Sequence, residues 1–348
     1  MKEAALAAHW QEFRLGNANP TAAVEAALQP FIAGQPLAAE QLAKDAAKYA
    51  LRKAAQKQCV THTQDGEFVG GKFYKNRTTL TEDIHRSREG TLFRLPAAID
   101  DINRQAILDQ TGVPYQGGVV LGEGANGRVQ IAETLTAEGR RDRVLAGKTA
   151  FGGAEERKGL GTEISVLTQA PDADVYSRVR ESYVGRTNLI LLQEFAAGGT
   201  CQALHNRLAA SDRIDPVEKQ DVLRTLARIY INAIALLHER EPPIHHGDIK
   251  DENFLVAQQA DAATRIILAD FGLALIPGPG TQLARQTEQG DRVALVRMLR
   301  GMNVQHPEWN AALQVVGDQR VTLRSALDNR CFESTLSADQ LTQTLARL

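Results

Sequence analysis

Short strand-like runs followed by long helical patterns predict an α+β fold with two segregated lobes. From Gly117 onward come apolar, β-branched runs separated by turn residues: GGVVLGEG, RVQIAE, RVLAGKTA and LILLQEF. After Gly199 the pattern changes to long helices, among them VLRTLARIYINAIALLHER. Strands that come first and helices that come after them argue against alternating βαβ units. We therefore expect a β-rich lobe followed by a helical lobe.

Composition and charge narrow the classes of function. The 348 residues include 40 Lys and Arg and 42 Asp and Glu, which leaves a net charge of -2. A near-neutral chain has no global field that attracts nucleic acid or an anionic membrane. No apolar run approaches the roughly 18 residues that span a bilayer, and polar residues interrupt the amino terminus before a Sec-type signal forms. We expect a soluble, intracellular protein with no nucleic-acid partner and no transmembrane segment.

The first third of the chain carries fewer signals. Residues 1–58 are rich in Ala and contain Pro-marked helix starts, which predict two or three short helices. A basic stripe around Lys48 fits a solvated helix face, and it also fits a docking site for an acidic partner or phospholipid. Further along, we expect a hairpin around Gly70 and Gly71 and a helix near residues 97–109.

A glycine-rich turn follows the first strand-like run. Gly122, Gly124 and Gly127 stand where the backbone can approach phosphate oxygens without a Cβ clash. Alone, the pattern also fits an ordinary glycine turn. It is not a Walker A loop, because no Gly-Lys-Ser/Thr follows, and a strand rather than a helix follows Val129, unlike a Rossmann fingerprint.

Lys148 ends the strand-like run LAGK, and Glu163 begins the helical pattern EISVLTQ. A Lys that holds phosphate oxygens needs a carboxylate to orient it, and a helix behind the strand can supply one. Taken alone, the pair also fits a surface Lys and a Glu at a helix N-terminus.

The loop HHGDIKDEN after the long helix is more specific. Asp248 and Asn253 can face one cavity, where the first accepts a hydroxyl proton and the second coordinates a divalent cation. Asp270 follows the apolar run IILA, at a strand end where a phosphate-bridging cation needs a carboxylate. The adjacent His245 and His246 fit a packed loop, since no third nitrogen or sulfur ligand lies at a suitable spacing.

Taken together and in this order, these elements resemble the signature set of the eukaryotic-type Ser/Thr protein kinase family. The resemblance implies a bilobal kinase-like fold, ATP, and Mg²⁺ or Mn²⁺. The implied nucleotide-binding residues are Gly122, Gly124, Gly127, Val129, Ala146, Lys148, Glu194 and Ala196, with Gln193 as gatekeeper. The implied catalytic residues are Asp248 as base, Lys250 at the transferred phosphate, Lys148 with its partner Glu163, and the metal ligands Asn253 and Asp270.

The resemblance implies a domain plan. A mainly helical extension, residues 1–113, would precede a kinase domain over 114–333, and residues 334–348 would form a tail. The N-lobe would span 114–196 and the C-lobe 197–333. Asp291 matches the Asp that braces the catalytic loop, and the stretch from Asp318 to Phe332 resembles the motif that closes the C-lobe.

The chain departs from the family at two places. Gly247 replaces the Arg that normally precedes the catalytic base and binds a phosphorylated activation loop, which predicts activity without loop phosphorylation. The segment from Asp270 to Asp291 is short, contains IPGPG and lacks Ala-Pro-Glu; its hydroxyls are Thr281 and Thr287. This trimming is similar to the compact kinases that bacterial pathogens inject into host cells. That similarity implies non-Sec secretion, a host protein substrate and a host activator.

Three functions stay open at this point. The first is an ATP-dependent Ser/Thr protein kinase with a protein substrate. The second is a small-molecule phosphotransferase of the aminoglycoside or choline kinase type, whose loop also reads His-Gly-Asp; Lys250 and the full glycine loop argue against it. The third is a pseudokinase interaction module, although none of the residues required for chemistry is missing.

Overall fold

The structure, a computed structural model, describes residues 62–63, 66–69, 72–75 and 84–348, apart from 125–126, 138, 152–153, 171–173, 185–187 and 334–335. The chain divides into two compact units, Met1–Arg86 and Ser87–Leu348. The helices and the basic stripe that we expect within residues 1–58 lie outside the described residues.

The described part of the first unit is antiparallel. Its strands are β1 (His62–Thr63), β2 (Gly66–Val69), β3 (Lys72–Lys75) and β4 (Ile84–Arg86). β2 and β3 pair from Gly66↔Lys75 to Val69↔Lys72, so the predicted hairpin is present.

The second unit begins with a sheet in which every described pairing is antiparallel. Its strands are β5 (Leu92–Arg94), β6 (Val120–Gly124), β7 (Gly127–Leu135), β8 (Arg141–Phe151), β9 (Arg180–Val184) and β10 (Asn188–Glu194). The order is β5-β7-β8-β10-β9, and β6 pairs with β7. Helix α5 (Ala154–Gln169) packs against β8 and β10. Phe93, Leu145 and Ile190 belong to a buried cluster within this lobe.

Helix α4 (Asp101–Thr111) confirms the helix expected near residues 97–109. A capping box starts it, in which Asp100 and Asn103 satisfy each other's backbone N–H groups. Ile107 of α4 packs with Ile131, Val144 and Phe195 in a second buried cluster. The compact unit thus includes α4, which our domain plan assigned to the extension.

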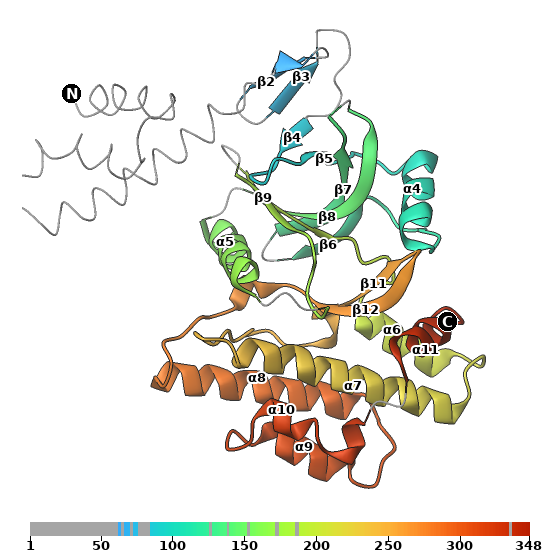
Figure 1. The fold of residues 1–348 in the computed structure, drawn as a ribbon, viewed down its shortest axis with the longest axis vertical. Helices are drawn as coiled ribbons and strands as arrows, with labels where there is room; N and C mark the ends of the chain where they lie inside the picture. Colours follow the sequence, from blue (N-terminus) through green and yellow to red (C-terminus); the bar gives the residue numbers. More distant parts are fainter. Residues whose placement is uncertain are drawn as a thin grey trace, which may run out of the picture. The chain divides into compact units, whose positions relative to one another are not determined.

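Helices dominate the rest of the chain. They are α6 (Cys201–Ala210), α7 (Pro216–His238), α8 (Gln282–Gly301), α9 (Trp309–Gly317), α10 (Leu323–Ala326) and α11 (Ala338–Leu345). A hairpin of β11 (Phe254–Gln259) and β12 (Ala262–Leu268) precedes α8. Figure 1 shows α7 and α8 side by side below this hairpin. One large apolar cluster, which includes Leu226, Ile234 and Leu295, joins these helices.

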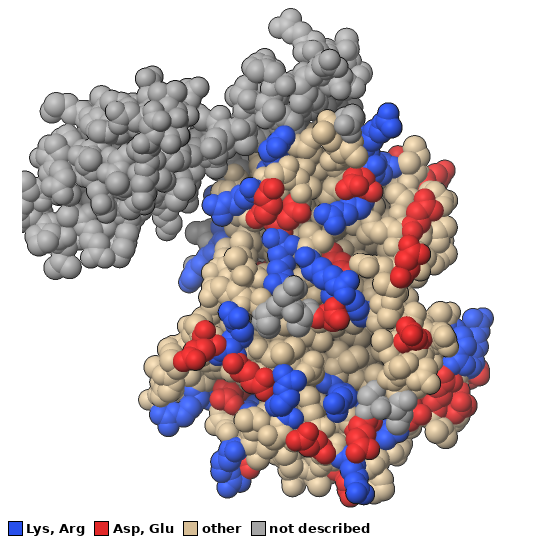
Figure 2. Space-filling model, viewed as in Figure 1, with Lys and Arg blue, Asp and Glu red and all other residues tan. Residues whose placement is uncertain are grey.

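The strands-then-helices order confirms the predicted α+β, bilobal kinase-like fold (Figure 1). No helix in the described part of the chain is long and apolar enough to cross a membrane. On the face drawn in Figure 2, basic and acidic side chains are interspersed.

Candidate active site

The catalytic-loop candidate leaves the end of α7 and is fixed by backbone pairing. His245 and Leu275 exchange both backbone hydrogen bonds, each at 2.8 Å. His246 is fully buried; its Nε2 donates to the Ala269 carbonyl at 3.0 Å, and its Nδ1 accepts from the Asp248 N–H at 3.3 Å. Burial lowers the pKa of His246 below its usual value, which favours the neutral ring at neutral pH. The loop thus connects α7 to the residues around Asp270.

Asp291, within α8, holds this loop through hydrogen bonds to its backbone. Its carboxylate accepts the N–H of His246 at 2.7 Å, the N–H of Gly247 at 2.8 Å and Nε2 of His238 at 2.9 Å. Burial opposes the ionised form, but these hydrogen bonds outweigh it and hold the pKa of Asp291 below its usual value. The geometry agrees with the bracing position that the resemblance implies for Asp291.

A buried ionic cluster joins β8, α5 and the residues that follow β12. Nζ of Lys148, on β8, donates to Glu163 on α5 and to Asp270 after β12, both at 2.7 Å. The Lys148 side chain is 9% exposed and that of Glu163 is 1% exposed. The structure therefore brings together three residues that are far apart in the sequence and that we selected as a set.

Burial and charge act in opposite directions in this cluster. Burial disfavours the Lys148 ammonium, yet Glu163 and Asp270 outweigh it and raise the pKa of Lys148. Burial raises the pKa of Glu163 despite the facing Lys148. Burial also opposes ionisation of Asp270, but Lys148 holds the pKa of that carboxyl below its usual value. Lys148 is therefore a cation, and Asp270 an anion, at neutral pH.

Asp248 lies in a more open setting. Lys250 Nζ donates to Asp248 Oδ2 at 2.6 Å, and Asn253 Nδ2 donates to the same oxygen at 3.1 Å and to the Asp248 carbonyl at 2.7 Å. The Asp248 hydrogen bond raises the pKa of Lys250. The Asn253 carbonyl accepts the Ala269 N–H at 2.8 Å, which joins this loop to the residue before Asp270.

The donor set fits a divalent cation between these elements. Asp270 contributes a carboxylate, and Asn253 contributes an amide oxygen because its Nδ2 is bonded to Asp248. Carboxylate and amide oxygens are the ligands that hard cations such as Mg²⁺ prefer.

The glycine-rich turn joins β6 to β7, and its tip, residues 125–126, lies outside the described part of the chain. Gly127 has φ +121°, and a Cβ there would lie 2.1 Å from the Thr149 carbonyl oxygen, so a larger residue does not fit. Gly122 pairs with Val129, Val129 with Lys148, and Ile131 with Ala146. Paired residues share a face, so Gly122, Val129, Lys148 and Ala146 lie on one face of the sheet.

The segment after β10 has the position expected for an adenine-binding hinge. The Glu194 N–H donates to Ser177 Oγ at 3.0 Å, and the Ala196 carbonyl accepts the Gly199 N–H at 3.1 Å. The resemblance assigns adenine contacts to the backbone from Glu194 to Ala196, and these two hydrogen bonds already use the Glu194 N–H and the Ala196 carbonyl. Gln193 pairs with Ala146, on the face shared with Lys148.

The structure explains why position 247 is a glycine, which the sequence motif alone did not. Its φ is +78°, and a Cβ would lie 2.6 Å from the Leu273 carbonyl oxygen. The backbone of the segment after Asp270 thus occupies the space of a side chain at position 247. An Arg at this position would need both a strained backbone and a displaced Leu273.

Both hydroxyls of the trimmed segment are already bonded. Thr281 caps the N-terminus of α8 by accepting the Ala284 N–H at 3.1 Å. Thr287 lies inside α8, where it is hydrogen-bonded to His245 Nδ1 and donates to the Leu283 carbonyl at 2.8 Å. The stretch between the 3₁₀ turn Phe271–Leu273 and α8 is therefore short and anchored at both ends.

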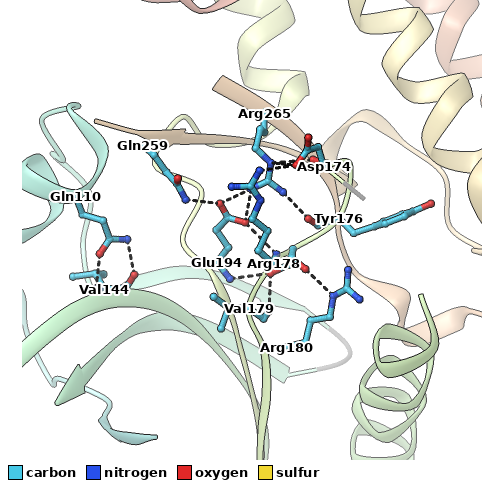
Figure 3. Close-up of polar contacts among 11 residues, drawn as sticks. Gln110, Val144, Asp174, Tyr176, Arg178, Val179, Arg180, Glu194, Gln259 and Arg265 are labelled. Atoms are coloured by element: carbon cyan, nitrogen blue, oxygen red, sulfur yellow. Dashed lines mark hydrogen bonds and ion pairs between the residues drawn. The ribbon is translucent and has the colours of Figure 1, made fainter. Parts of the chain in front are cut away.

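Sequence reasoning missed a polar cluster behind the hinge (Figure 3). The side chain of Glu194, assigned above only for its backbone, accepts two hydrogen bonds from Arg265 at 2.8 and 2.9 Å. Gln259 Nε2 donates to the same carboxylate at 3.2 Å. No motif spacing links these positions, because the hairpin β11–β12 brings them to the hinge only in the folded chain.

Comparison with known proteins places this site in a family. The profile of the protein kinase domain matches residues 115–292, about half of the chain. A stretch of 174 residues is 25% identical to CBL-interacting serine/threonine-protein kinase 24 of Arabidopsis thaliana, covering 50% of this chain and 36% of that protein. A stretch of 217 residues is 28% identical to the serine/threonine-protein kinase DCLK1 of Mus musculus, covering 62% of this chain and 25% of that protein.

A third match, 34% identical over 101 residues, is the protein kinase domain-containing protein ppk38 of Schizosaccharomyces pombe; it covers 29% of this chain and 14% of that protein. The chain therefore spans well under two thirds of the length of each of these relatives. Fold, site and family profile agree: this chain belongs to the protein kinase domain family. Of these three relatives, two are serine/threonine-protein kinases.

Proposed function

We propose that this chain is an ATP-dependent Ser/Thr protein kinase that acts on a protein substrate. The observation that carries the proposal is that Lys148 bridges Glu163 and Asp270, while the Asn253 carbonyl accepts the Ala269 N–H and so joins the loop of Asp248 and Lys250 to the residue before Asp270. Bound ATP supplies the phosphoryl group, and Mg²⁺ or Mn²⁺ neutralises charge on its phosphates.

The residues of the chain have separate tasks. Lys148, oriented by Glu163, would hold phosphate oxygens, and Asn253 and Asp270 would hold the cation. Lys250 and Asn253 both bond Asp248 through Oδ2, so Oδ1 is the oxygen placed to accept the proton of the acceptor hydroxyl. Lys250, whose side chain is 45% exposed, can then turn to the transferring phosphoryl group.

This kinase would not need phosphorylation of its activation segment. Gly247 takes the place of the Arg that would bind such a phosphate. Thr281 and Thr287 are used as a helix cap and as a partner of His245. The His245–Leu275 backbone pair holds the segment in place without a modification.

The expectation of a host protein substrate, a host activator and non-Sec secretion rests on the trimmed segment and on the Ala-, Gln- and Arg-rich extension, which would suit a targeting or partner-binding region. It stays a prediction. The small-molecule phosphotransferase and the pseudokinase remain the competing functions. They differ from the proposal in what receives label from ATP.

The test incubates the full chain with γ-labelled ATP and Mg²⁺, with and without a basic carrier protein and a eukaryotic lysate. Asp270→Ala is the inactive variant, and Asp261→Ala, at an exposed turn, is its matched control. We expect label on Ser or Thr with wild type and Asp261→Ala, and none with Asp270→Ala. Label on small molecules only, or nucleotide binding without transfer, would overturn the proposal in favour of the phosphotransferase or the pseudokinase.

A further inference from the structure

Helix α4 lies N-terminal to the residues that match the protein kinase domain, yet it contacts both lobes. It packs against β8 in the N-lobe sheet and against β11, in the hairpin that precedes α8. Figure 1 shows α4 at the side of the sheet, above β11. A helix placed in this way can fix one lobe relative to the other.

The N-terminal half of α4 is anchored to the sheet. Asn103, 1% exposed, donates through Nδ2 to Glu133 on β7. Glu133 is fully buried and ion-paired to Arg94 at 2.6 Å and to Arg141 at 2.8 Å. Because the Glu133 carboxylate is itself held by two strands, this end of α4 moves with the N-lobe.

Gln110, near the C-terminal end of α4, makes a second contact between this helix and the sheet. Its Nε2 donates to the Val144 carbonyl at 2.8 Å, and its Oε1 accepts the Val144 N–H at 2.7 Å (Figure 3). β10 ends at Glu194, opposite Leu145, so Val144 lies one residue beyond the end of that pairing. The Gln110 amide supplies the two hydrogen bonds that a further strand residue would supply.

The backbone of the same residue binds the other lobe. The Gln110 carbonyl accepts the Ala260 N–H at 3.1 Å, and Ala260 lies in the turn of the β11–β12 hairpin. Gln110 therefore bonds to one lobe through its side chain and to the other through its backbone. Rotation of the lobes about the hinge would break one of these two sets of hydrogen bonds.

The hinge begins where the pairing of β10 with β8 ends, at Glu194 opposite Leu145, one residue from the Val144 that Gln110 binds. Phe195, in the hinge, is 2% exposed and packs edge-to-face on Tyr115, just after α4, with ring centroids 5.5 Å apart. On the C-lobe side, Arg265 and Gln259 hold the Glu194 carboxylate. The backbone that would meet adenine is thus held from behind by α4 and by the hairpin.

We infer that α4 is a strut between the lobes and that Gln110 is a positioning residue, which keeps the hinge and both lobes in the arrangement that binds the nucleotide. The inference rests on the proposed kinase function for its kinetic consequence. Without the strut, other lobe arrangements become populated, and the apparent affinity for ATP falls with the competent fraction. Saturating ATP selects the competent arrangement again, so turnover at saturation recovers.

The test compares Gln110→Ala and Gln110→Glu with Gln105→Ala, which removes an exposed amide from the same helix. Gln110→Glu keeps the length of the side chain but places a carboxylate against the Val144 carbonyl, so it should behave like Gln110→Ala. We expect the KM for ATP to rise about fivefold in both Gln110 variants, which corresponds to about one net hydrogen bond. We expect kcat to change less than about twofold and the KM for the protein substrate to stay constant.

A parallel measurement separates this inference from the proposed function. The Kd for ADP, measured by calorimetry, should rise in the same ratio whether or not the chain transfers phosphate. If wild type transfers no phosphate while the ADP Kd rises in the Gln110 variants, the kinase proposal fails and the strut stands. An unchanged ADP Kd in both Gln110 variants, or a fall in kcat with an unchanged KM for ATP, would overturn the strut.

Discussion

The two ion pairs of the site, one on the sheet and one on the loop after α7, differ in how far they are buried. On the sheet side, the side chains of Lys148 and Glu163 are 9% and 1% exposed. On the loop side, those of Lys250 and Asp248 are 45% and 31% exposed. The N···O distances are alike, 2.7 Å and 2.6 Å, so burial rather than geometry distinguishes the two pairs.

The difference fits what each pair would do. A buried pair has low conformational freedom and a strong mutual interaction, which suits a fixed support for phosphates. An exposed pair contributes little to stability and can exchange partners, which suits groups that meet a changing substrate. We therefore expect the Lys148–Glu163 pair to serve both stability and chemistry, and the Lys250–Asp248 pair to serve chemistry alone.

The largest expected effect is a loss of turnover on substitution of Asp248, in the loop. Asp248→Asn removes the proton acceptor while keeping the shape, and we expect turnover to fall about 10²- to 10⁴-fold. The free energy of unfolding should stay within about 0.5 kcal/mol of wild type, because the replaced group is partly exposed. Initial rates and urea unfolding of the same preparations check both statements.

Asp251→Asn is the control, since Asp251 stands in the same loop but faces His205 at 3.5 Å. We expect it to retain near wild-type turnover. Equal rates for Asp248→Asn and Asp251→Asn would break the assignment of Asp248.

A smaller effect is expected where the loop meets the trimmed segment. Gly247→Ala places a Cβ 2.6 Å from the Leu273 carbonyl oxygen at a φ of +78°, and we expect it to cost about 1 to 3 kcal/mol of unfolding free energy. Gly290→Ala is the matched control, because Gly290 lies inside α8 with nothing within 4 Å of its added Cβ. That change should stabilise the fold by about 1 kcal/mol. A neutral Gly247→Ala would contradict the contact with Leu273.

The smallest effect concerns pH and the buried histidines under the loop. Burial lowers the pKa of His246, and burial together with the facing His238 lowers that of His245, from the usual 6.5. The unfolded chain therefore binds protons near pH 6.5 that the folded chain does not, so stability falls as the pH drops through about 6.5 towards the lowered values. The lowered pKa of Asp291 acts in a separate window, below its usual 3.8.

Urea unfolding between about pH 7.5 and about pH 5.5 measures this loss. His245→Gln, which keeps a hydrogen-bonding side chain without a titratable ring, should make the loss smaller. A flat stability profile over this range in wild type would contradict the burial of neutral histidines.

Much of the fold and the site could be predicted because it depends on local signals. The runs around Gly122, Lys148 and Gln193 alternate or carry turn residues, and each became a strand of the sheet. Lys148, Glu163 and Asp270 were selected as parts of one motif set, and the fold brings them within hydrogen-bond distance. The roles of these residues stay predictions.

The rest depends on contacts that no local pattern encodes. α8 begins at Gln282, well before the apolar pattern that starts at Asp291, because its first turns are mostly polar and depend on the Thr281 cap. Arg265 binds the hinge residue Glu194, and Gln110 binds Val144 on β8; both come from distant segments, and neither stands in a recognisable motif. Position 247 requires a glycine because the backbone of Leu273 lies against it, and the sequence does not predict that contact.

The contrast between the buried and the exposed pair is tested most directly by measuring unfolding free energy and turnover together for Lys148→Ala and Lys250→Ala. Both variants should lose most of their turnover. Lys148→Ala should also lose about 2 kcal/mol or more of unfolding free energy, because it leaves Glu163 buried without its cation, whereas Lys250→Ala should lose less than about 0.5 kcal/mol. Equal stabilities for the two variants, or full turnover in either, would contradict the account.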